Sequence, residues 1–449
     1  MMAETVTTTD PRAPVQILVI ADDFTGANDT GVALVEHGMA VCVRFDLTHC
    51  TKSEGDRRAS IYSTDSRALN ATEAAQSVRR VIQAALPTFS SRRWVFKKMD
   101  STLRGNPGAE TEAALMALDC PLAIVATAVP DLGRVVIEGL CYVNGCLLTD
   151  TEFGTDPKTP VNTASVGKRL AEQTALRQHH VSLHALRAND FQTQLTALVD
   201  AGIRIVIADS QTSEDLARLV QAAETLPFRP LLVGASGLSQ ALASHCLSGI
   251  KTSTPFEVRR PAPVLAVVGS MSEAAAGQIA FALQHRSAAL INIDVLMLFT
   301  DRATQWLTQL STQICSAIEK GKHCIVSTCQ NTDQRQYVAQ FCQQNQISRQ
   351  HMGNSIATFI GQLIQHVFQK IETRPGGVYL SGGDIALAVA RALGATGFEI
   401  KGQIAGCVPW GYLQESQIEC LPVLTKAGGF GHENTLLEVL RFIEEKLSE

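Results

Sequence analysis

Apolar runs recur along the chain, and many of them end abruptly in polar or glycine-rich turns. The first run, residues 15–21, is almost uninterrupted and leads into two adjacent carboxylates, Asp22 and Asp23, before a turn through Gly26. A short apolar run bounded by turn residues indicates a strand that is buried on both faces. Residues 27–36 can form a helix. This order of strand, acidic turn and helix predicts the first unit of an open α/β sheet.

The same alternation continues to about residue 247. Asn106 and Pro107 mark a helix start, because Asn is a favoured N-cap and Pro suits the first helical position. Residues 127–165 are rich in glycine and irregular in pattern. Further strands are predicted at 40–45, 60–63, 93–98, 122–126, 203–208 and 230–233, and helices at about 72–85, from 107 and from 213.

The pattern stops near residue 248 and restarts at residue 264. Residues 248–263 are polar and carry three prolines, a composition typical of an interdomain linker. Ser270 and Glu273 have the spacing of a capping box, which predicts a helix directly after the strand at 264–268. Further strands are predicted at 324–327, 378–380 and 423–424.

These alternating elements predict an α/β protein of two domains, each a mostly parallel sheet flanked by helices, with the active site in the cleft between them. Residues 15–247 are predicted to be the first domain and residues 264–449 the second. Residues 1–14 are polar and proline-containing, so we expect a disordered leader.

The composition narrows the classes of partner. The chain has 449 residues, of which 45% are apolar, and a formal net charge of -5. This charge gives no reason to expect nucleic acid or a membrane surface as a partner. No apolar run approaches the roughly 18 residues of a membrane span, and the polar start lacks the apolar core of a secretion signal, so we expect a cytoplasmic protein. A homo-oligomer is left open.

Polar side chains gather where the predicted strands of the first domain end. Because the carboxyl ends of parallel strands lie along one edge of a sheet, we expect these turns to converge on one crevice. The turns contain Asp22 and Asp23, then Arg67, then Lys98, Asp100, Ser101 and Arg104, and finally the small residues after Pro130.

The stretch from Lys97 to Gly105 is the most informative of these turns. It places cations and hydroxyls beside a predicted helix start, a combination that binds carboxylates or phosphates. Side chains alternate between the two faces of a strand, so only one of the two lysines should reach the crevice, and we favour Lys98.

In the second domain the candidate turns are rich in glycine. Glycines directly after a strand let backbone amides approach an anionic ligand, which suits the phosphates of a nucleotide. Neither a P-loop nor the common dinucleotide fingerprint is present. The residues concerned are Ser270, then Ser381, Gly382, Gly383 and Asp384, and finally Gly428 and Gly429.

Each of these features also has a purely structural interpretation. Asp22 and Asp23 could be turn and capping residues, since Asp is common in such turns. The lysines could be solvated residues at a strand end. Any one of the glycine turns could be an ordinary loop.

Taken together, the motifs resemble the four-carbon acid sugar kinase family. They occur in the family's order over nearly the whole chain: Ala21 to Gly31, Lys98 to Gly105, Gly234 to Leu238, Gly269-Ser270, Ser381 to Asp384 and Lys426 to Gly431. One departure is that the family often has Gly-Gly-Glu-Thr where this chain has Gly382-Gly383-Asp384-Ile385. Asp384 keeps a carboxylate at shorter reach, whereas Ile385 removes a hydroxyl.

The resemblance implies that the first domain binds a sugar acid and the second binds ATP with Mg²⁺. It also implies phosphoryl transfer to the 4-hydroxyl of a four-carbon sugar acid, with D-threonate as the expected substrate. The two domains are then expected to close about residues 248–263. The implied substrate-binding residues are Asp22, Asp23, Arg67, Lys98, Asp100, Ser101 and Arg104, with Asp22 or Asp23 acting on the reacting hydroxyl. The implied ATP-binding residues are Ser270, Ser381, Gly382, Gly383, Asp384, Gly428 and Gly429.

Other interpretations stay open at this point. D-erythronate or 3-oxo-tetronate could replace D-threonate, because these acids differ at only one or two carbons. A nicotinamide-dependent sugar-acid dehydrogenase would keep the same architecture, although the dinucleotide fingerprint is missing. A non-catalytic sugar-acid sensor would bind in the same crevice without turnover. The sequence assigns no metal ligands.

Overall fold

The structure is a computed structural model that describes residues 15–47, 58–90, 93–155, 160–247, 262–328 and 334–446. The predicted leader (1–14) and nearly all of the predicted linker (248–263) lie outside the described residues. The structure therefore does not test either of these two predictions.

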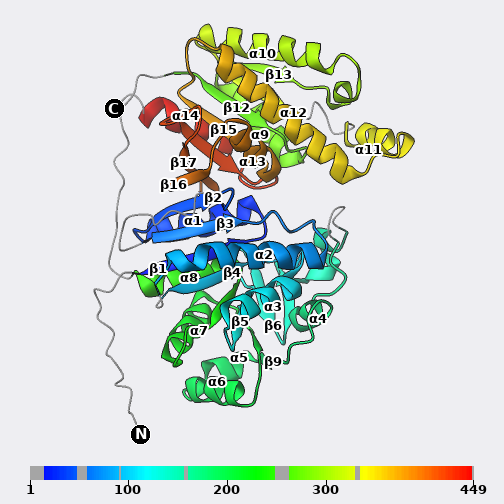
Figure 1. Ribbon diagram of the computed structural model, residues 1–449. Coiled ribbons are helices and arrows are strands. Elements are labelled where there is room, and N and C mark those ends of the chain that lie inside the picture. Colours follow the sequence, from blue (N-terminus) through cyan, green and yellow to red (C-terminus); the bar gives the residue numbers. More distant parts are fainter. Residues whose placement is uncertain are drawn as a thin grey trace.

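The described chain forms an α/β fold around one large sheet of 15 strands, most of them parallel, with helices packed on it (Figure 1). The predicted fold class is therefore confirmed. The strand order is β13-β14-β12-β15-β18-β17-β16-β2-β3-β1-β4-β11-β5-β10-β9. In Figure 1 the strands from the first half of the chain lie below and those from the second half above.

The first half contributes a parallel set of strands in which β1 is central. It pairs with β3 on one side and with β4 on the other. The strands are β1 (Gln16–Ala21), β2 (Ala40–Arg44), β3 (Arg58–Ser63), β4 (Trp94–Lys98), β5 (Ala123–Ala126), β9 (Gln178–Val181), β10 (Ile205–Ala208) and β11 (Leu231–Gly234). The helices are α1 (Phe24–Glu36), α2 (Ala71–Ala85), α3 (Pro107–Leu118), α4 (Val166–Ala171), α5 (Leu183–Arg187), α6 (Phe191–Asp200), α7 (Ser213–Thr225) and α8 (Ser236–Cys246).

The glycine-rich region at 127–165 is more regular than expected. It forms a small antiparallel sheet of β6 (Arg134–Ile137), β7 (Leu140–Val143) and β8 (Cys146–Leu147). Tight turns at positive φ, such as Gly139 and Gly145, interrupt the apolar pattern every few residues, which is why the sequence looked irregular.

The second half contributes another parallel set and two antiparallel strands. The strands are β12 (Val264–Val268), β13 (Ala288–Asn292), β14 (His323–Ser327), β15 (Gly377–Ser381), β16 (Gly397–Ile404), β17 (Val408–Gln414) and β18 (Pro422–Lys426). The helices are α9 (Glu273–His285), α10 (Ala303–Glu319), α11 (Gln334–Gln344), α12 (Arg349–Lys370), α13 (Gly383–Ala392) and α14 (Thr435–Lys446).

The strands β16 and β17, which the sequence pattern did not predict, join the two halves. β16 pairs antiparallel with β17 and, on its other edge, antiparallel with β2. The two predicted sheets are therefore one continuous sheet. Aromatic side chains pack across the junction, with the ring of Phe24 lying 5.6 Å from that of Phe45 and 6.3 Å from that of Phe398.

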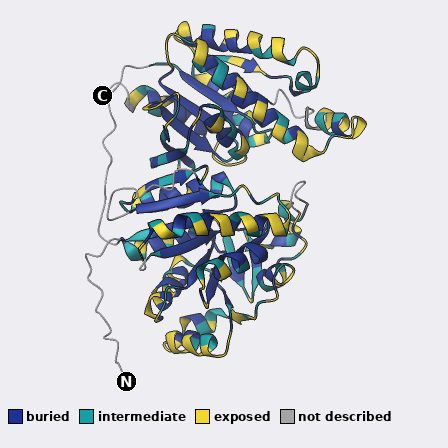
Figure 2. Cartoon of the chain, viewed as in Figure 1, coloured by how far each residue is buried: buried dark blue, intermediate teal, exposed yellow. Residues whose placement is uncertain are grey.

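The core explains why the central strands are apolar throughout. In β1, Ile17 and Val19 pack into a core that extends through both halves, whereas Leu18 and Ile20 face a second core against α2 and α3. All four side chains are fully buried, and such a residue contributes about 1.5–3 kcal/mol relative to an exposed one. Figure 2 shows the buried sheet between helices whose outer faces are exposed.

Candidate active site

The turns after β1, β3 and β4 meet because these strands are parallel and end level with one another. Ala21 pairs in register with Ser63 on one side and with Lys98 on the other. The chain then turns at Asp22, Arg67 and Asp100. The predicted convergence of these polar turns is therefore present in the structure.

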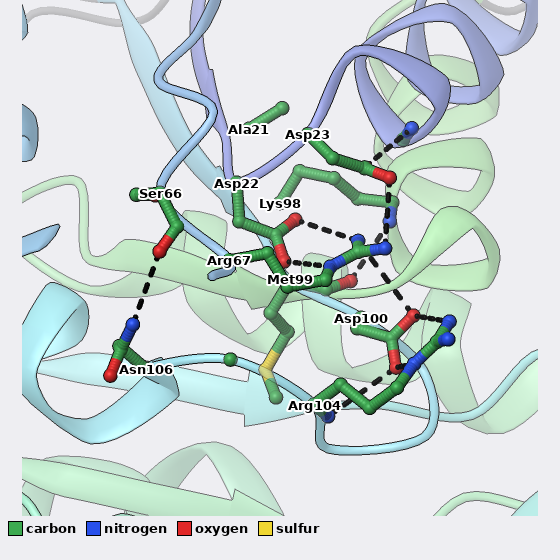
Figure 3. A network of polar contacts seen from close by, with 12 residues as sticks. Ala21, Asp22, Asp23, Ser66, Arg67, Lys98, Met99, Asp100, Arg104 and Asn106 are labelled. Carbon is green, nitrogen blue, oxygen red and sulfur yellow. Dashed lines mark hydrogen bonds and ion pairs between the residues drawn. The ribbon is translucent and has the colours of Figure 1, made fainter. Parts of the chain in front are cut away.

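Arg67 is the centre of this cluster (Figure 3). Its Nε lies 2.8 Å from Oδ2 of Asp22, and its Nη2 lies 3.2 Å from Oδ1 of the same residue. Nη1 lies 2.8 Å from Asp23, and Nη2 lies 3.7 Å from Asp100. One guanidinium thus holds three carboxylates together, and Asp100 in turn binds Arg104 through two hydrogen bonds of 2.9 Å.

The electrostatic state of the three aspartates follows from these contacts. Burial acts to raise the pKa of Asp22, but Arg67 and Lys97 outweigh it and hold the pKa below its ordinary value of 3.8. Burial likewise opposes Arg67 and Arg104 at Asp100, whose pKa is held well below 3.8. At Asp23 burial prevails over Arg67, and the neighbouring Asp22 adds to it, so that the pKa is raised.

Asp22 and Asp23 differ in position. Asp22 is buried behind Arg67, whereas Asp23 lies on the wall of a cavity. Asp23 is also the N-cap of α1, since its Oδ1 accepts a hydrogen bond of 2.8 Å from Gly26 N. The capping interpretation is thus correct for Asp23, and the same carboxylate also binds Arg67.

The two lysines at the end of β4 separate as the alternation of the strand predicts. Lys97 points into the interior, where its Nζ lies 2.9 Å from the buried carboxylate of Glu110. Lys98 lies on the wall of the same cavity as Asp23, and its Nζ donates a hydrogen bond of 2.8 Å to Met99 O. Within the described residues, Lys98 makes no ion pair.

This first cavity has a volume of about 630 Å³ and opens where the strand-end turns of the first half face a turn of the second half. It brings together six of the seven predicted substrate-binding residues: Asp23, Arg67, Lys98, Asp100, Ser101 and Arg104. It also contains residues that were not predicted as site residues, namely Arg134 and Phe153, together with Asp29 and Ser236, which lie within the motifs Ala21 to Gly31 and Gly234 to Leu238.

Arg134 stands out among the unpredicted residues. It begins β6 and donates a hydrogen bond through Nη1 to Ser101 Oγ, while its guanidinium carbon lies 5.6 Å from the centre of the Phe153 ring. Its buried Nε has no hydrogen-bond partner, and burial lowers its pKa. No carboxylate among the described residues pairs with Arg134, so its charge is directed at the cavity.

A second cavity of 580 Å³ adjoins the first and has a different character. The turn at Gly382, Gly383 and Asp384, where α13 begins, forms one wall, and Gly269 lies beside it. The opposite wall consists of helix residues: Val338, Ala339 and Cys342 from α11, and Met352, Gly353 and Ile356 from α12, with Arg349 at the start of α12 beside them. This arrangement suits a nucleotide. Its base can lie against the apolar wall, and its phosphates can bind the backbone amides at the start of α13.

The departure at Ile385 has a packing explanation. Ile385 is buried, and a Cβ on Gly269 would lie only 2.2 Å from its Cγ1. The isoleucine therefore fills the space that the glycine leaves at the end of β12.

The turn after β18 lies at the first cavity rather than at the second. Residues 427–431, including Gly428 and Gly429, line the first cavity beside the sugar-side residues. Lys426 Nζ donates hydrogen bonds of 2.8, 3.1 and 2.8 Å to the carbonyls of residues 427, 428 and 430. Because these peptides are trans, their N–H groups point away from the ammonium.

Ser270 supports this turn, but it does not cap α9 as predicted. The N-cap is Ser272, whose Oγ accepts from Ala275 N, so the predicted capping box of Ser270 and Glu273 is wrong. Ser270 instead hydrogen-bonds to Ser272 and lies so close to Gly428 that a Cβ there would be 2.5 Å from its Oγ. Ser381 is buried at the end of β15 and is not among the residues that line either cavity.

The two cavities share Asp23 and Thr25. The contact is close, because a Cβ on Gly383 would lie 2.7 Å from Thr25 Oγ1. Asn28 of α1 also donates a hydrogen bond of 3.1 Å to Thr425 of β18. The N-terminal end of α1 is therefore the place where the two halves of the site meet.

Comparison with known proteins agrees with this division of the chain. A model described as a sugar-binding N-terminal domain matches residues 17–242, and a model described as a nucleotide-binding C-terminal domain matches residues 265–436. Within the described residues, no helix is long and apolar enough to cross a membrane.

Individual relatives match over nearly their whole length. A D-threonate kinase of Salmonella typhimurium is 38% identical over 96% of this chain and 99% of that protein. A D-erythronate kinase of Heliobacterium modesticaldum is 30% identical over 96% of this chain and 98% of that protein. A crystal structure of a Salmonella typhimurium LT2 protein, 26% identical, covers 95% of this chain and 99% of that one with a TM-score of 0.79.

Proposed function

Because the chain belongs to the four-carbon acid sugar kinase family, we propose that it transfers the γ-phosphoryl group of ATP to the 4-hydroxyl of a four-carbon sugar acid, with D-threonate as the substrate. The observation that carries this proposal is the pair of adjoining cavities. One is lined by charged side chains and the other by apolar residues and backbone, and they meet at Asp23 and Thr25.

The first cavity holds the sugar acid. Arg67 is already compensated by three carboxylates, so it acts mainly by fixing Asp23 in position. The substrate carboxylate instead lies against Lys98 and Arg134, which make no ion pair within the described residues. A planar guanidinium with a free Nε suits a carboxylate. Asp23, Asp100 and Ser101 then accept or donate hydrogen bonds to the substrate hydroxyls.

ATP lies in the second cavity, with its base against α11 and α12 and its phosphates toward the first cavity. The amides at the start of α13 and in the turn at residues 428–431 neutralise phosphate charge. Phosphoryl transfer depends mainly on positioning and charge neutralisation, which this arrangement supplies.

Mg²⁺ is expected to enter the site as a complex with ATP. Magnesium in such sites is held by substrate phosphates, waters and one or two carboxylates. No group of three or more His, Cys, Asp or Glu side chains that could hold a metal occurs in the part of the chain that the structure describes. Mg²⁺ would therefore arrive bound to ATP and would neutralise the charge on its phosphates.

A coupled ADP-release assay with ATP and Mg²⁺ tests the proposal. The acids to compare are D-threonate, D-erythronate, L-threonate and 3-oxo-tetronate. We expect the highest kcat/KM with D-threonate. A higher value with D-erythronate or 3-oxo-tetronate would keep the kinase and change its substrate, whereas no acid-dependent ADP release would refute the proposed function. Reduction of NAD with the same acids would support a dehydrogenase instead.

A further inference from the structure

Asp29 occupies a place in the site that the other aspartates do not. It lies on α1, six positions after Asp23, and lines the first cavity. It also borders a narrow space between α1 and the end of β18, next to Lys426 and Ala427. Its side chain is exposed to the cavity at the point where the sugar-side residues face the turn at residues 427–431.

The bonding of Asp29 also differs from that of its neighbours. Asp23 is bound by Arg67 and by the amide of Gly26, and Asp100 is bound by Arg104. The carboxylate of Asp29, a residue within α1, makes no hydrogen bond or ion pair with any described residue. Among the aspartates that line the first cavity, it is thus the one whose carboxylate oxygens are free to accept a proton from a ligand.

The orientation of the substrate in the first cavity indicates which of its groups lies near Asp29. Arg134 and Phe153 mark one end of the cavity, where the substrate carboxylate binds in the function proposed above. Asp29 also borders residues of the second half, among them Gly383 and Lys426, and the γ-phosphoryl group must come from that half. The terminal hydroxyl of a four-carbon acid is the group farthest from its carboxylate.

We propose that Asp29 is the catalytic base for phosphoryl transfer, an inference that rests on the kinase function proposed above. The oxygen of the 4-hydroxyl attacks the γ-phosphorus of ATP, and a new O–P bond forms. The bond between the γ-phosphorus and the bridging oxygen breaks, and ADP leaves with the electron pair. The hydroxyl proton passes to Asp29, which later releases it to solvent.

The charges around Asp29 set the pH at which it can act. Although the Asp29 side chain is exposed to the cavity, the protein atoms around the cavity limit its hydration. Together with the negative charge of Asp23, this desolvation raises the pKa of Asp29 to about 6, against the opposing charge of Lys98. Arg67 and Arg134 also oppose the increase. On the side of the second half, Cys407 and Lys426 face the same space.

An aspartate with a raised pKa accepts protons more readily than an ordinary one, and it still carries its charge at neutral pH. Activity that needs this charge is present above about pH 6 and is lost as the pH falls through that value. An ordinary aspartate would place this limb near pH 4.

The test compares Asp29→Asn with the unaltered enzyme in steady-state kinetics from pH 5 to 8. We expect kcat to fall by about 10²- to 10⁴-fold, the usual contribution of a general base, with the acid limb near pH 6 lost. The KM values for ATP and the sugar acid should change little. Asp29→Glu restores a carboxylate and should recover part of the rate together with an acid limb.

Glu36→Gln is the matched control, because it removes a carboxylate from the last turn of the same helix, away from the cavity. We expect its kcat and pH profile to equal those of the unaltered enzyme. Thermal unfolding of Asp29→Asn should show an unchanged or higher Tm, since no bond of Asp29 is lost.

Two results would overturn the inference. Asp29→Asn could retain a near-normal rate and the same acid limb. Alternatively, excess Mg²⁺ could restore its rate, which would make Asp29 a metal ligand rather than a base. If instead the unaltered enzyme phosphorylated no four-carbon acid, the proposed function itself would fail, which is a distinct outcome.

Discussion

The two cavities recognise their ligands with different parts of the protein. The first is lined by charged side chains, and Arg67 alone contacts three carboxylates within 4 Å. The second has mainly apolar helix residues and a turn of glycines in its walls, with Arg349 and Asp384 among them, so it offers chiefly shape and backbone amides. Charged side chains can be placed to match the hydroxyls and the carboxylate of one particular small acid. A nucleotide is instead recognised by its phosphates and its flat base, which backbone amides and an apolar wall can bind.

This difference predicts different responses to mutation. Removing one member of a buried charged network lowers stability strongly, because the remaining charges stay buried without a partner. A cavity of apolar residues and backbone loses affinity gradually as its shape changes. Loss of the shared cation of the first cavity should therefore lower stability strongly, and loss of one of its carboxylates should lower mainly sugar-acid turnover. Substitutions in the second cavity, or in the glycine turn at residues 427–431 that faces the ATP phosphates in the proposed function, should change mainly the KM for ATP.

Arg67→Met should have the largest effect. It leaves Asp22, Asp23 and Asp100 without their shared cation, and we expect the free energy of unfolding to fall by about 3–5 kcal/mol and activity to be lost. Arg67 lowers the pKa of Asp22 and Asp100 below 3.8, so it stabilises the folded protein only where these carboxylates are ionised. The loss of unfolding free energy in the variant should therefore be complete above pH 3.8 and should shrink as the pH falls below that value.

Urea unfolding at pH 7 measures the effect. Arg187→Met is the control, because it removes the arginine of a similar two-bond pair whose guanidinium is half exposed, and it should lower stability less than Arg67→Met does. Equal losses for the two variants would contradict the idea of a charged network in the first cavity.

Asp23→Asn should have the next largest effect. Asn can still accept the hydrogen bond from Gly26 N and cap α1, but it loses the charge that binds Arg67 and faces the substrate. We expect kcat/KM for the sugar acid to fall about 10²-fold with little change in Tm. Asp190→Asn, at the start of α6, serves as the control. Near-normal turnover with D-threonate would remove Asp23 from the site.

Gly428→Ala should have an intermediate effect. Its Cβ would lie 2.5 Å from Ser270 Oγ, so the turn must shift, at a cost of about 1–3 kcal/mol. The shift should raise the KM for ATP. The adjacent Gly429→Ala is the control, because its Cβ would meet no atom within 4 Å. Steady-state kinetics with ATP varied would show equal KM values if the turn did not contact the nucleotide.

Gly353→Leu should have the smallest effect. A Cβ on this residue of α12 would meet no atom within 4 Å, so the new side chain enters the second cavity. We expect the KM for ATP to rise roughly fivefold, which corresponds to a loss of about 1 kcal/mol in binding free energy. Stability should not fall, since Leu favours a helix more than Gly does.

Gly277→Leu is the control for this variant. Gly277 lies in α9, and a Cβ there would also meet no atom within 4 Å, but this position is outside the cavity. A KM for ATP that is unchanged in Gly353→Leu would place the nucleotide elsewhere.

The sequence allowed the first cavity to be predicted better than the second, for a physical reason. Parallel strands bring their carboxyl ends together, so polar residues that follow apolar runs can be assigned to one edge without knowing the structure. Asp23, Arg67 and Lys98 were found in this way. Arg134 was not, because it follows a turn in a region without a clear pattern. Asp29 resembles an ordinary polar residue of a helix.

The walls of the second cavity could not be predicted from the sequence. Met352 and Ile356 have the spacing of core residues in a helix, and nothing in that spacing distinguishes a cavity wall from packed core. The union of the two sheets was also missed, because β16 and β17 are antiparallel strands with exposed positions and a register shift between Ile400 and Gly402. The predicted linker and the closing motion about it stay predictions.

The central claim is that the site transfers phosphate from ATP to the terminal hydroxyl of D-threonate. The most direct measurement is to incubate the protein with ATP, Mg²⁺ and D-threonate and to locate the new phosphate by ³¹P NMR, through its coupling to the protons on C4. We predict 4-phospho-D-threonate formed in step with ADP. Phosphate on another oxygen, or ADP formed with free phosphate alone, would contradict the account.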